Sequence, residues 1–137
     1  MINPNLYQTL PHDIICTHTN DCATTSFHEH DSYEIYLLSN GNLNFYLEQQ
    51  GFHMSKGSGL FISPNVFHRS QQPINGTCET CSIHIRSDYF RTLNSLQTNL
   101  AKVLISNDRP FFHFQLTEEH MGYFLEKSLE LEKSLHQ

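Results

Sequence analysis

Two histidines and a glutamate lie close together in the segment FHEHDSYEIYLLSNG, which spans residues 27–41. His28 and His30 are two residues apart, and Glu34 follows four residues later. Residues two apart in a strand point to the same side, so these side chains would share one space. His68 supplies a third imidazole if the turn at Pro64 brings its strand opposite the first. Imidazoles with a carboxylate can hold a divalent metal or hydrogen-bond a small molecule.

Three interpretations of this histidine–glutamate set remain open from the residues alone. The set can form the polar wall of an effector pocket. It can ligate zinc, iron, manganese or nickel through His28, His30, Glu34 and His68, with open positions for a substrate. It can also be structural, with each group satisfied by its neighbours. His84, in the strand-like run SIHIR, is a further candidate to face the same space.

Aromatic residues accompany the set along the same segment. Tyr36 continues the face of Glu34, and Phe45 alternates with Tyr46, so only one of the last two can look inward. We expect Phe45 inward, either as a ring for a sugar-like ligand or as plain barrel core. The predicted ligand-binding residues are His28, His30, Glu34, Tyr36, Phe45 and His68.

Short strands separated by turns are expected from Asp13 to about Gln72, followed by a further strand at CSIHIR. YEIYLLS ends at NGN, which predicts a hairpin turn before the alternating run LNFYLEQ. After Arg86 the period becomes helical, with Ser87 as a possible cap and Pro110 as a stop. The apolar positions of that helical run are Phe90, Leu93, Leu96 or Gln97, Leu100 and Leu104.

A last helix is expected after the strand-like run FFHFQL, with Thr117 as its N-cap. It carries a stripe at three- and four-residue steps, formed by Met121, Phe124, Leu125, Ser128, Leu131 and Leu135. The stripe can dock on its own barrel or pair with the same helix of a second subunit. No Gly or Pro ends the pattern before Gln137, which indicates a fragment of a longer protein.

The composition fits one globular domain of 137 residues with a net charge of −6. The basic residues form no cluster, so the chain is not expected to bind DNA or RNA by itself. There is no signal peptide and no apolar run of about 20 residues, so no membrane is expected and a cytoplasmic setting is the default. The cysteines Cys16, Cys22, Cys78 and Cys81 are expected to be free thiols, although CETC has the spacing of half a zinc site or of a redox pair.

HEHDSYEIYLLSNG resembles the first cupin motif, H-x-H-x(3)-E-x(6)-G, and matches it up to Gly41. The second motif is looser: Gly59, Pro64 and His68 are in order, but the last two are one residue closer than usual and the middle Gly is missing. The longer run FHEHDSYEIYLLSNGNLNFYLEQQGFHMSKGSGLFISPNVFHRS is more similar to the sensor domain of AraC-type transcriptional regulators.

The resemblance implies a mainly β fold, a cupin double-stranded β-helix (jelly-roll barrel) followed by C-terminal α-helices. It implies an N-terminal arm at 1–12, a β-barrel at 13–86 and a helical, dimerising part at 87–137. The barrel of such a domain binds a small effector, often a sugar or related metabolite, and the C-terminal helix, with the stripe defined above, forms a homodimer. DNA is bound by a separate helix-turn-helix domain, which is absent from these residues.

Two functions follow from these observations. The first is a small-molecule sensing and dimerisation domain of a transcriptional regulator, with no catalytic residue and no required cofactor. The alternative is a small metal-dependent cupin enzyme, a dioxygenase or isomerase, with the histidine–glutamate set as metal ligands. The shortened second motif and the unfinished last helix favour the sensor.

Overall fold

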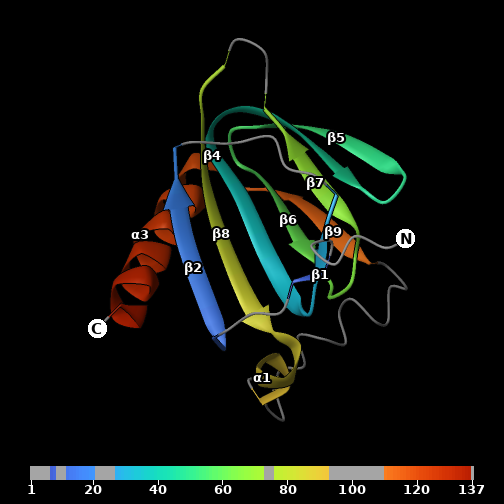
Figure 1. The fold of residues 1–137 in the computed structure, drawn as a ribbon. Helices are drawn as coiled ribbons and strands as arrows, with labels where there is room; N and C mark the ends of the chain where they lie inside the picture. Colours follow the sequence, from blue (N-terminus) through green and yellow to red (C-terminus); the bar gives the residue numbers. More distant parts are fainter. Residues whose placement is uncertain (1–6, 9–11, 21–26, 73–75, 93–109, 137) are drawn as a thin grey trace.

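The computed structural model describes residues 7–8, 12–20, 27–72, 76–92 and 110–136. The strands and helices follow one another along the chain from an N-terminal β part to the C-terminal helix α3 (Figure 1). Their bounds are β1 Tyr7–Gln8, β2 Ile14–Thr19, β3 Glu29–His30, β4 Ser32–Leu47, β5 Gln50–Ser55, β6 Ser58–Ile62, β7 His68–Gln71, β8 Cys78–Arg86, α1 Ser87–Thr92, β9 Phe111–Gln115 and α3 Glu118–Leu135.

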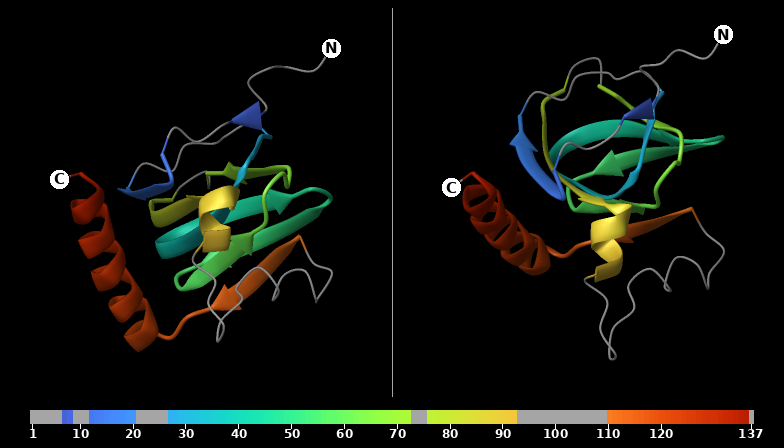
Figure 2. Two further views of the ribbon diagram at one scale, coloured as in Figure 1. Left: turned by 90° about the horizontal axis from the view of Figure 1, so that it is seen from below. Right: turned by 60° about the horizontal axis from the view of Figure 1, so that its bottom comes forward.

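The strands form one seven-stranded antiparallel sheet in the order β2-β8-β4-β6-β9, and β5 and β7 also pair with β4. A separate pair of short parallel strands joins β1 to β3. Figure 2 shows the large sheet curled around its interior, with α3 along the outside. The predicted class, a mainly β barrel followed by α-helices, is confirmed. The strand β9 returns to the barrel beside β6, so the segment 87–137 contributes a strand as well as helices.

Strand β4 is the longest element and pairs with four others. Its register against β8 shifts between Leu38 and Asn40, which marks a β-bulge. The hairpin expected at Asn40-Gly41 was therefore wrong, because the strand continues through these residues. Gly41 has a φ of 89°, and a Cβ there would lie 1.8 Å from the Thr77 carbonyl oxygen. Gly41 thus gives the bulge the positive φ that a hairpin turn at the same Asn-Gly pair would also need.

The bulge exchanges the inward and outward positions of β4 because the side-chain period of a strand is two. Ahead of the bulge Glu34 and Leu38 are buried inside, and beyond it Leu43, Phe45 and Leu47 are. The interior core consists of Leu38, Leu43, Phe45, Leu47, Met54, Leu60, Ile62, Val66 and Cys78. An outer core, on the opposite face of the sheet, consists of Cys16, Leu37, Cys81, Ile83 and Met121 with partly buried neighbours.

Helix α3 covers the outer core and packs mainly on β2. Thr117 is its N-cap, as predicted, and its hydroxyl accepts a hydrogen bond from the His120 backbone N–H at 3.2 Å. Met121 and Ser128 of the predicted stripe are buried. Phe124, Leu125 and Leu131 are partly buried against the same core, whereas Leu135 is exposed. The stripe therefore docks on the chain's own barrel.

Part of the predicted first helix is present as α1, which begins at Ser87 and buries Phe90. The later positions Leu93, Leu96, Gln97, Leu100 and Leu104 lie outside the described residues, as do Cys22 and most of the N-terminal arm. Among the residues described, no helix is long and apolar enough to cross a membrane.

The bulge generates a stability prediction. We expect Gly41→Ala to lower the free energy of unfolding by about 3 kcal/mol or more, because the methyl group meets a backbone carbonyl and the positive φ is strained for alanine. Gly122→Ala is the matched control, since nothing lies within 4 Å of a Cβ at that exposed helical position. It should stabilise by about 0.5–1 kcal/mol. Urea denaturation of both variants measures the contrast, and equal effects would contradict the role given to Gly41.

Candidate functional site

Inside the barrel, the carboxylate of Glu34 is surrounded by three imidazoles. It lies 3.1 Å from His30 Nε2, 3.3 Å from His68 Nε2 and 3.4 Å from His84 Nε2. His30, Glu34 and His68 are buried, with side chains 3–6% exposed, and His84 is about one-fifth exposed. With His28, these residues form what we call the histidine–glutamate cluster.

Strand pairing brings the members of the cluster together. Glu34 of β4 lies directly opposite His84 of β8. His28 and His68 form an isolated antiparallel bridge with two backbone hydrogen bonds of 3.0 Å each. The ring centres of His28 and His68 are 4.4 Å apart, and those of His30 and His68 are 4.9 Å apart. The convergence expected from spacing is therefore present, and His84 joins it.

The shortened second motif is accommodated at Asn65. Asn65 has a φ of 64° in the left-handed region, which asparagine tolerates better than most residues other than glycine. Its backbone N–H donates to the carbonyl oxygen of His30 at 2.9 Å. The turn after Pro64 is thus tied to the strand that carries His30, and it delivers His68 to the cluster.

Opposite charges dominate the electrostatics of the cluster. Burial by itself raises the pKa of Glu34, but the positive charge of His84 and the close approach of the His30, His68 and His84 imidazoles lower it well below its usual range. Burial by itself lowers the pKa of His84, but the charge of Glu34 and its hydrogen bond raise it. The carboxylate is therefore ionised at neutral pH, and it favours a protonated His84.

His68 has one ring nitrogen without a hydrogen-bond partner. Its Nδ1 lies 2.7 Å from the carbonyl oxygen of Val66, which can only accept, so Nδ1 carries the proton. Its Nε2 is buried, lies 3.3 Å from the Glu34 carboxylate, and has no partner in hydrogen-bond geometry among the described residues. An imidazole held by a backbone carbonyl, with its other nitrogen turned toward further donors, is the usual arrangement of a metal ligand.

The orientation of the His68 imidazole indicates that the histidine–glutamate cluster can hold a divalent cation. The ligand atoms of His28, His30 and His68 lie within 4.8 Å of one another, and so do those of His30, Glu34 and His84. The cation would supply Lewis-acid polarisation of a bound group.

Tyr36 and Phe45 lie beside the cluster, on the inward face. The Phe45 ring is 4.9 Å from that of Tyr36 and stacks on His68 at 5.7 Å with an angle of 14° between the planes. Phe45 is only 2% exposed, so its ring faces are covered by neighbours. Burial raises the pKa of Tyr36, and the charge of Glu34 adds to this. Both rings therefore belong to the packed wall of the cluster.

Sequence reasoning missed a cavity of about 1030 Å³ next to the cluster. Its walls are largely aromatic and its rim carries polar side chains, and we call it the aromatic cavity. It is lined by Phe27, Leu47, Glu48, Gln49, Gln50, Phe52, Phe67, Pro110, Phe111 and His113. The available signal was the pair of dipeptides Phe27-His28 and Phe67-His68, because alternation along a bridged strand pair sends rings and imidazoles to opposite sides.

Arg69 stands beside the aromatic cavity. Its guanidinium carbon lies 5.1 Å from the ring centre of Phe27 and 4.8 Å from that of Tyr46. The Nε of Arg69 is buried and makes no hydrogen bond within the described part of the chain. The Arg69 guanidinium is therefore held by two aromatic rings, and its Nε–H remains able to donate a hydrogen bond.

The family described as "AraC-like ligand binding domain" matches residues 13–124. No curated protein sequence matches the chain. Among solved structures, apo ToxT K231A from Vibrio cholerae strain SCE256 has a TM-score of 0.60 at 10% identity, over 90% of this chain and 49% of that chain. Wild-type ToxT from the same strain, bound to an unsaturated fatty acid, has a TM-score of 0.57 at 12% identity, over 81% and 43%.

A third similar structure is a protein from Ralstonia eutropha JMP134, named as a candidate mannose-6-phosphate isomerase. Its TM-score is 0.51 at 11% identity, over 55% of this chain and 76% of that chain. This chain spans about half the length of the ToxT structures it matches. At these identities the structural likeness establishes the fold, and the jelly-roll barrel expected from the motifs is confirmed.

The raised pKa of His84 predicts a pH dependence of stability. Because the folded pKa lies above that of an unfolded histidine, about 6.5, the contribution of His84 is fully present below that value and is lost as the pH rises through the folded pKa. The difference in free energy of unfolding between the wild type and His84→Gln should therefore shrink from pH 6 to pH 9. Urea titrations in the presence of a chelator measure it, with the exposed His120→Gln as control. A difference that grows with pH would contradict the pairing with Glu34.

Proposed function

Because the chain belongs to the family of AraC-like ligand-binding domains, we propose that it senses a small effector for a transcriptional regulator and binds that effector in the aromatic cavity. The observation that carries this proposal is the cavity itself, whose volume of about 1030 Å³ is at the upper end of small-molecule sites. The histidine–glutamate cluster does not line this cavity, but Phe27 and Phe67, the chain neighbours of His28 and His68, do.

The aromatic lining, together with Arg69, which contacts the lining residue Phe27 without lining the cavity itself, favours an amphipathic effector with an apolar body and an acidic end. Phe27, Phe52 and Phe67 offer apolar area to the body of the ligand. The guanidinium of Arg69 lies over the Phe27 ring, its Nε has no hydrogen-bond partner among the described residues, and a carboxylate is the group that a guanidinium pairs with best. The fatty acid bound by ToxT, which has the same fold, belongs to this chemical class.

A sugar is the competing effector class. Glu34 and the imidazoles would hydrogen-bond its hydroxyl groups, but Phe45 offers no free ring face on which a sugar could stack. The buried carboxylate also needs its imidazole partners for itself. The geometry therefore supports an apolar acid better than a sugar.

The effector would act on a longer, dimeric regulator in the cytoplasm, with DNA bound by a helix-turn-helix domain outside residues 1–137. Ligand binding would shift the population of arrangements available to that regulator. The helical stripe proposed for the homodimer is largely occupied by the barrel. A dimer through α3 would therefore use its outer face, where Tyr123 and Leu129 are exposed large apolar residues.

The alternative function is a metal-dependent cupin enzyme, and it is favoured by one specific observation. His68 Nε2 is buried without a partner in hydrogen-bond geometry in the described part of the chain, and His28 and His30 offer ligand atoms nearby. A divalent cation held by His28, His30, Glu34 and His68 would satisfy that nitrogen. The chemistry would be that of a dioxygenase or isomerase.

Effector binding is tested with oleate as the probe, below its micelle concentration, and with its methyl ester as the uncharged control. Oleate should raise the thermal midpoint of the chain, because it binds the folded state only. Arg69→Gln should weaken binding about 10- to 100-fold, the equivalent of one lost charge-assisted hydrogen bond of roughly 1.5–3 kcal/mol. Lys127→Gln, which removes an exposed positive charge on α3, is the matched control. A response to sugars and none to oleate would overturn the acid proposal.

The enzyme alternative is tested by elemental analysis of the purified chain. It predicts one tightly bound divalent metal per chain, reduced to a small fraction in His68→Gln. The exposed His53→Gln should leave the content unchanged. Protein that folds and binds effector with equal metal content in the wild type and His68→Gln would count against a catalytic metal at this cluster.

A further inference from the structure

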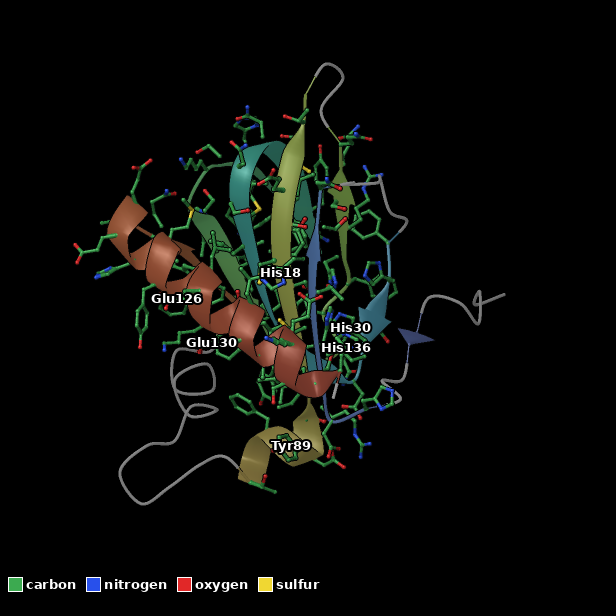
Figure 3. The ribbon with its side chains drawn as sticks, turned by 90° about the vertical axis from the view of Figure 1, so that its left-hand side faces the viewer. His18, His30, Tyr89, Glu126, Glu130 and His136 are labelled. Carbon is green, nitrogen blue, oxygen red and sulfur yellow. The ribbon has the colours of Figure 1, made fainter. Side chains whose placement is uncertain are left out.

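A second set of metal-ligating side chains lies on the opposite face of the sheet, under α3. It consists of Cys16 and His18 of β2 and Cys81 of β8, which we call the cysteine–histidine cluster. Their potential ligand atoms all lie within 4.8 Å of one another. Cys81 is directly opposite His18 in the strand register, and Cys16 is two residues before His18, so all three share the outer face. Figure 3 shows His18 beside α3, where the helix crosses the strands.

The cysteines of this cluster are available for ligation. Cys16 and Cys81 are free thiols, 2% and 0% exposed. Cys78, the other cysteine of CETC, points into the interior core and is disulfide-bonded, which corrects the expectation that it is a free thiol. The two cysteines of CETC are three residues apart and lie on opposite faces of β8, so CETC does not act as one pair.

Polar groups of α3 complete the cluster within an otherwise apolar interface. Cys16 Sγ donates to the backbone carbonyl of Ser128 at 3.4 Å. Ser128 Oγ lies 2.8 Å from His18 Nε2 and 2.9 Å from the Leu125 carbonyl oxygen. The serine hydroxyl has one proton and cannot donate to both acceptors at once. When it donates to Leu125, the lone pair of His18 Nε2 receives no proton from Ser128.

Glu132 fixes the tautomer of His18. The carboxylate of Glu132 hydrogen-bonds Nδ1 of His18, and a carboxylate only accepts, so Nδ1 carries the proton. Nε2 is then the nitrogen with the lone pair, and it lies beside Ser128 Oγ. A carboxylate on the far nitrogen is how histidine ligands are oriented and made more basic at zinc sites.

We propose that Cys16, Cys81 and His18 bind a thiophilic divalent cation, Zn²⁺, with the fourth position taken by water beside Ser128. Two thiolates and an imidazole are ligands that zinc prefers, and the water completes the four ligands of a tetrahedral site. Binding forms two zinc–sulfur bonds and one zinc–nitrogen bond and releases the two thiol protons to solvent. A pocket of about 430 Å³, lined in part by His18, Thr80 and Leu129, connects the histidine of the site with solvent.

The consequence is a metal-dependent attachment of α3 to the barrel. The ligands come from β2 and β8, whereas Glu132, the positioning residue for His18, comes from the fourth turn of α3. The site is therefore complete only when the helix is docked, and an ion bound there stabilises the docked helix over the free one.

The test uses Co²⁺ as a spectroscopic probe on the reduced, metal-free chain, followed by displacement with Zn²⁺. Thiolate ligation gives a sulfur-to-cobalt charge-transfer absorption, which the sulfur-free histidine–glutamate cluster cannot give. The wild type should show this band at one equivalent and lose it when Zn²⁺ is added. The band should persist in His68→Gln and vanish in Cys81→Ser. Its absence from the wild type would overturn the proposal.

Variants separate ligation from a structural effect. Glu132→Gln should weaken Zn²⁺ binding about 10- to 100-fold in competition with a chromophoric chelator, the usual cost of losing a carboxylate behind a histidine ligand. Glu126→Gln, an exposed glutamate on the same helix, is the matched control and should bind as the wild type does. If Cys81→Ser fails to fold, His18→Gln and Glu132→Gln carry the test. Closure of Cys16 and Cys81 into a disulfide, with no cobalt band after reduction, would also overturn the proposal.

Discussion

The fold depends on the hydrogen-bonded pairing of β4, a single strand of sixteen residues. Its first half pairs with β6 and β8, and its second half pairs with β5 and β7. The bulge near Gly41 lets one strand serve both halves, because it bends the strand and moves the inward face from even to odd residues. The interior core, the buried Glu34 and the outer core under α3 all follow from this one alternation.

A carboxylate inside an apolar barrel is costly unless it is paired, and here the pairing creates the site. Glu34 is stabilised by imidazoles from three other places in the chain, so the cluster adds side-chain contacts between strands that are already paired through their backbones. The aromatic cavity differs from the cluster, because its phenylalanine rings are apolar and require no hydrogen-bond or charged partner. The bridge between His28 and His68 carries residues of both compartments, because Phe27 and Phe67 line the cavity.

The period of two was enough to predict from the sequence that His28, His30 and Glu34 share a face, and that Phe45 rather than Tyr46 looks inward. The Asn40-Gly41 pair was misinterpreted because a hairpin turn and a bulge demand the same positive φ, and only the pairing partners distinguish them. The apolar stripe of the last helix could be predicted from the sequence, but the surface that it packs against could not, because an apolar face is compatible with any apolar partner surface.

The cavity and the cysteine–histidine cluster were out of reach for another reason. The two Phe-His dipeptides indicate only part of the cavity wall, because Phe52 and Phe111 come from separate segments that no spacing relates to them. Cys16 and Cys81 meet only because β2 pairs with β8 across more than sixty residues, and a register of that kind is set by the whole sheet. Local sequence patterns predict the face of a strand on which a residue lies, whereas the pairing of the strands determines which other residues it contacts.

The bridge between His28 and His68 has an evolutionary consequence. Phe27-His28 and Phe67-His68 each place one phenylalanine ring in the cavity and one imidazole in the barrel. A one-residue shift in strand register would therefore turn the imidazole toward the cavity and the ring toward the barrel interior. Insertions and deletions next to these dipeptides are therefore excluded unless a nearby residue absorbs them. Asn65, with its left-handed backbone, is where this chain carries its shorter loop. Length variation among natural relatives should concentrate at that turn and leave both dipeptides in phase.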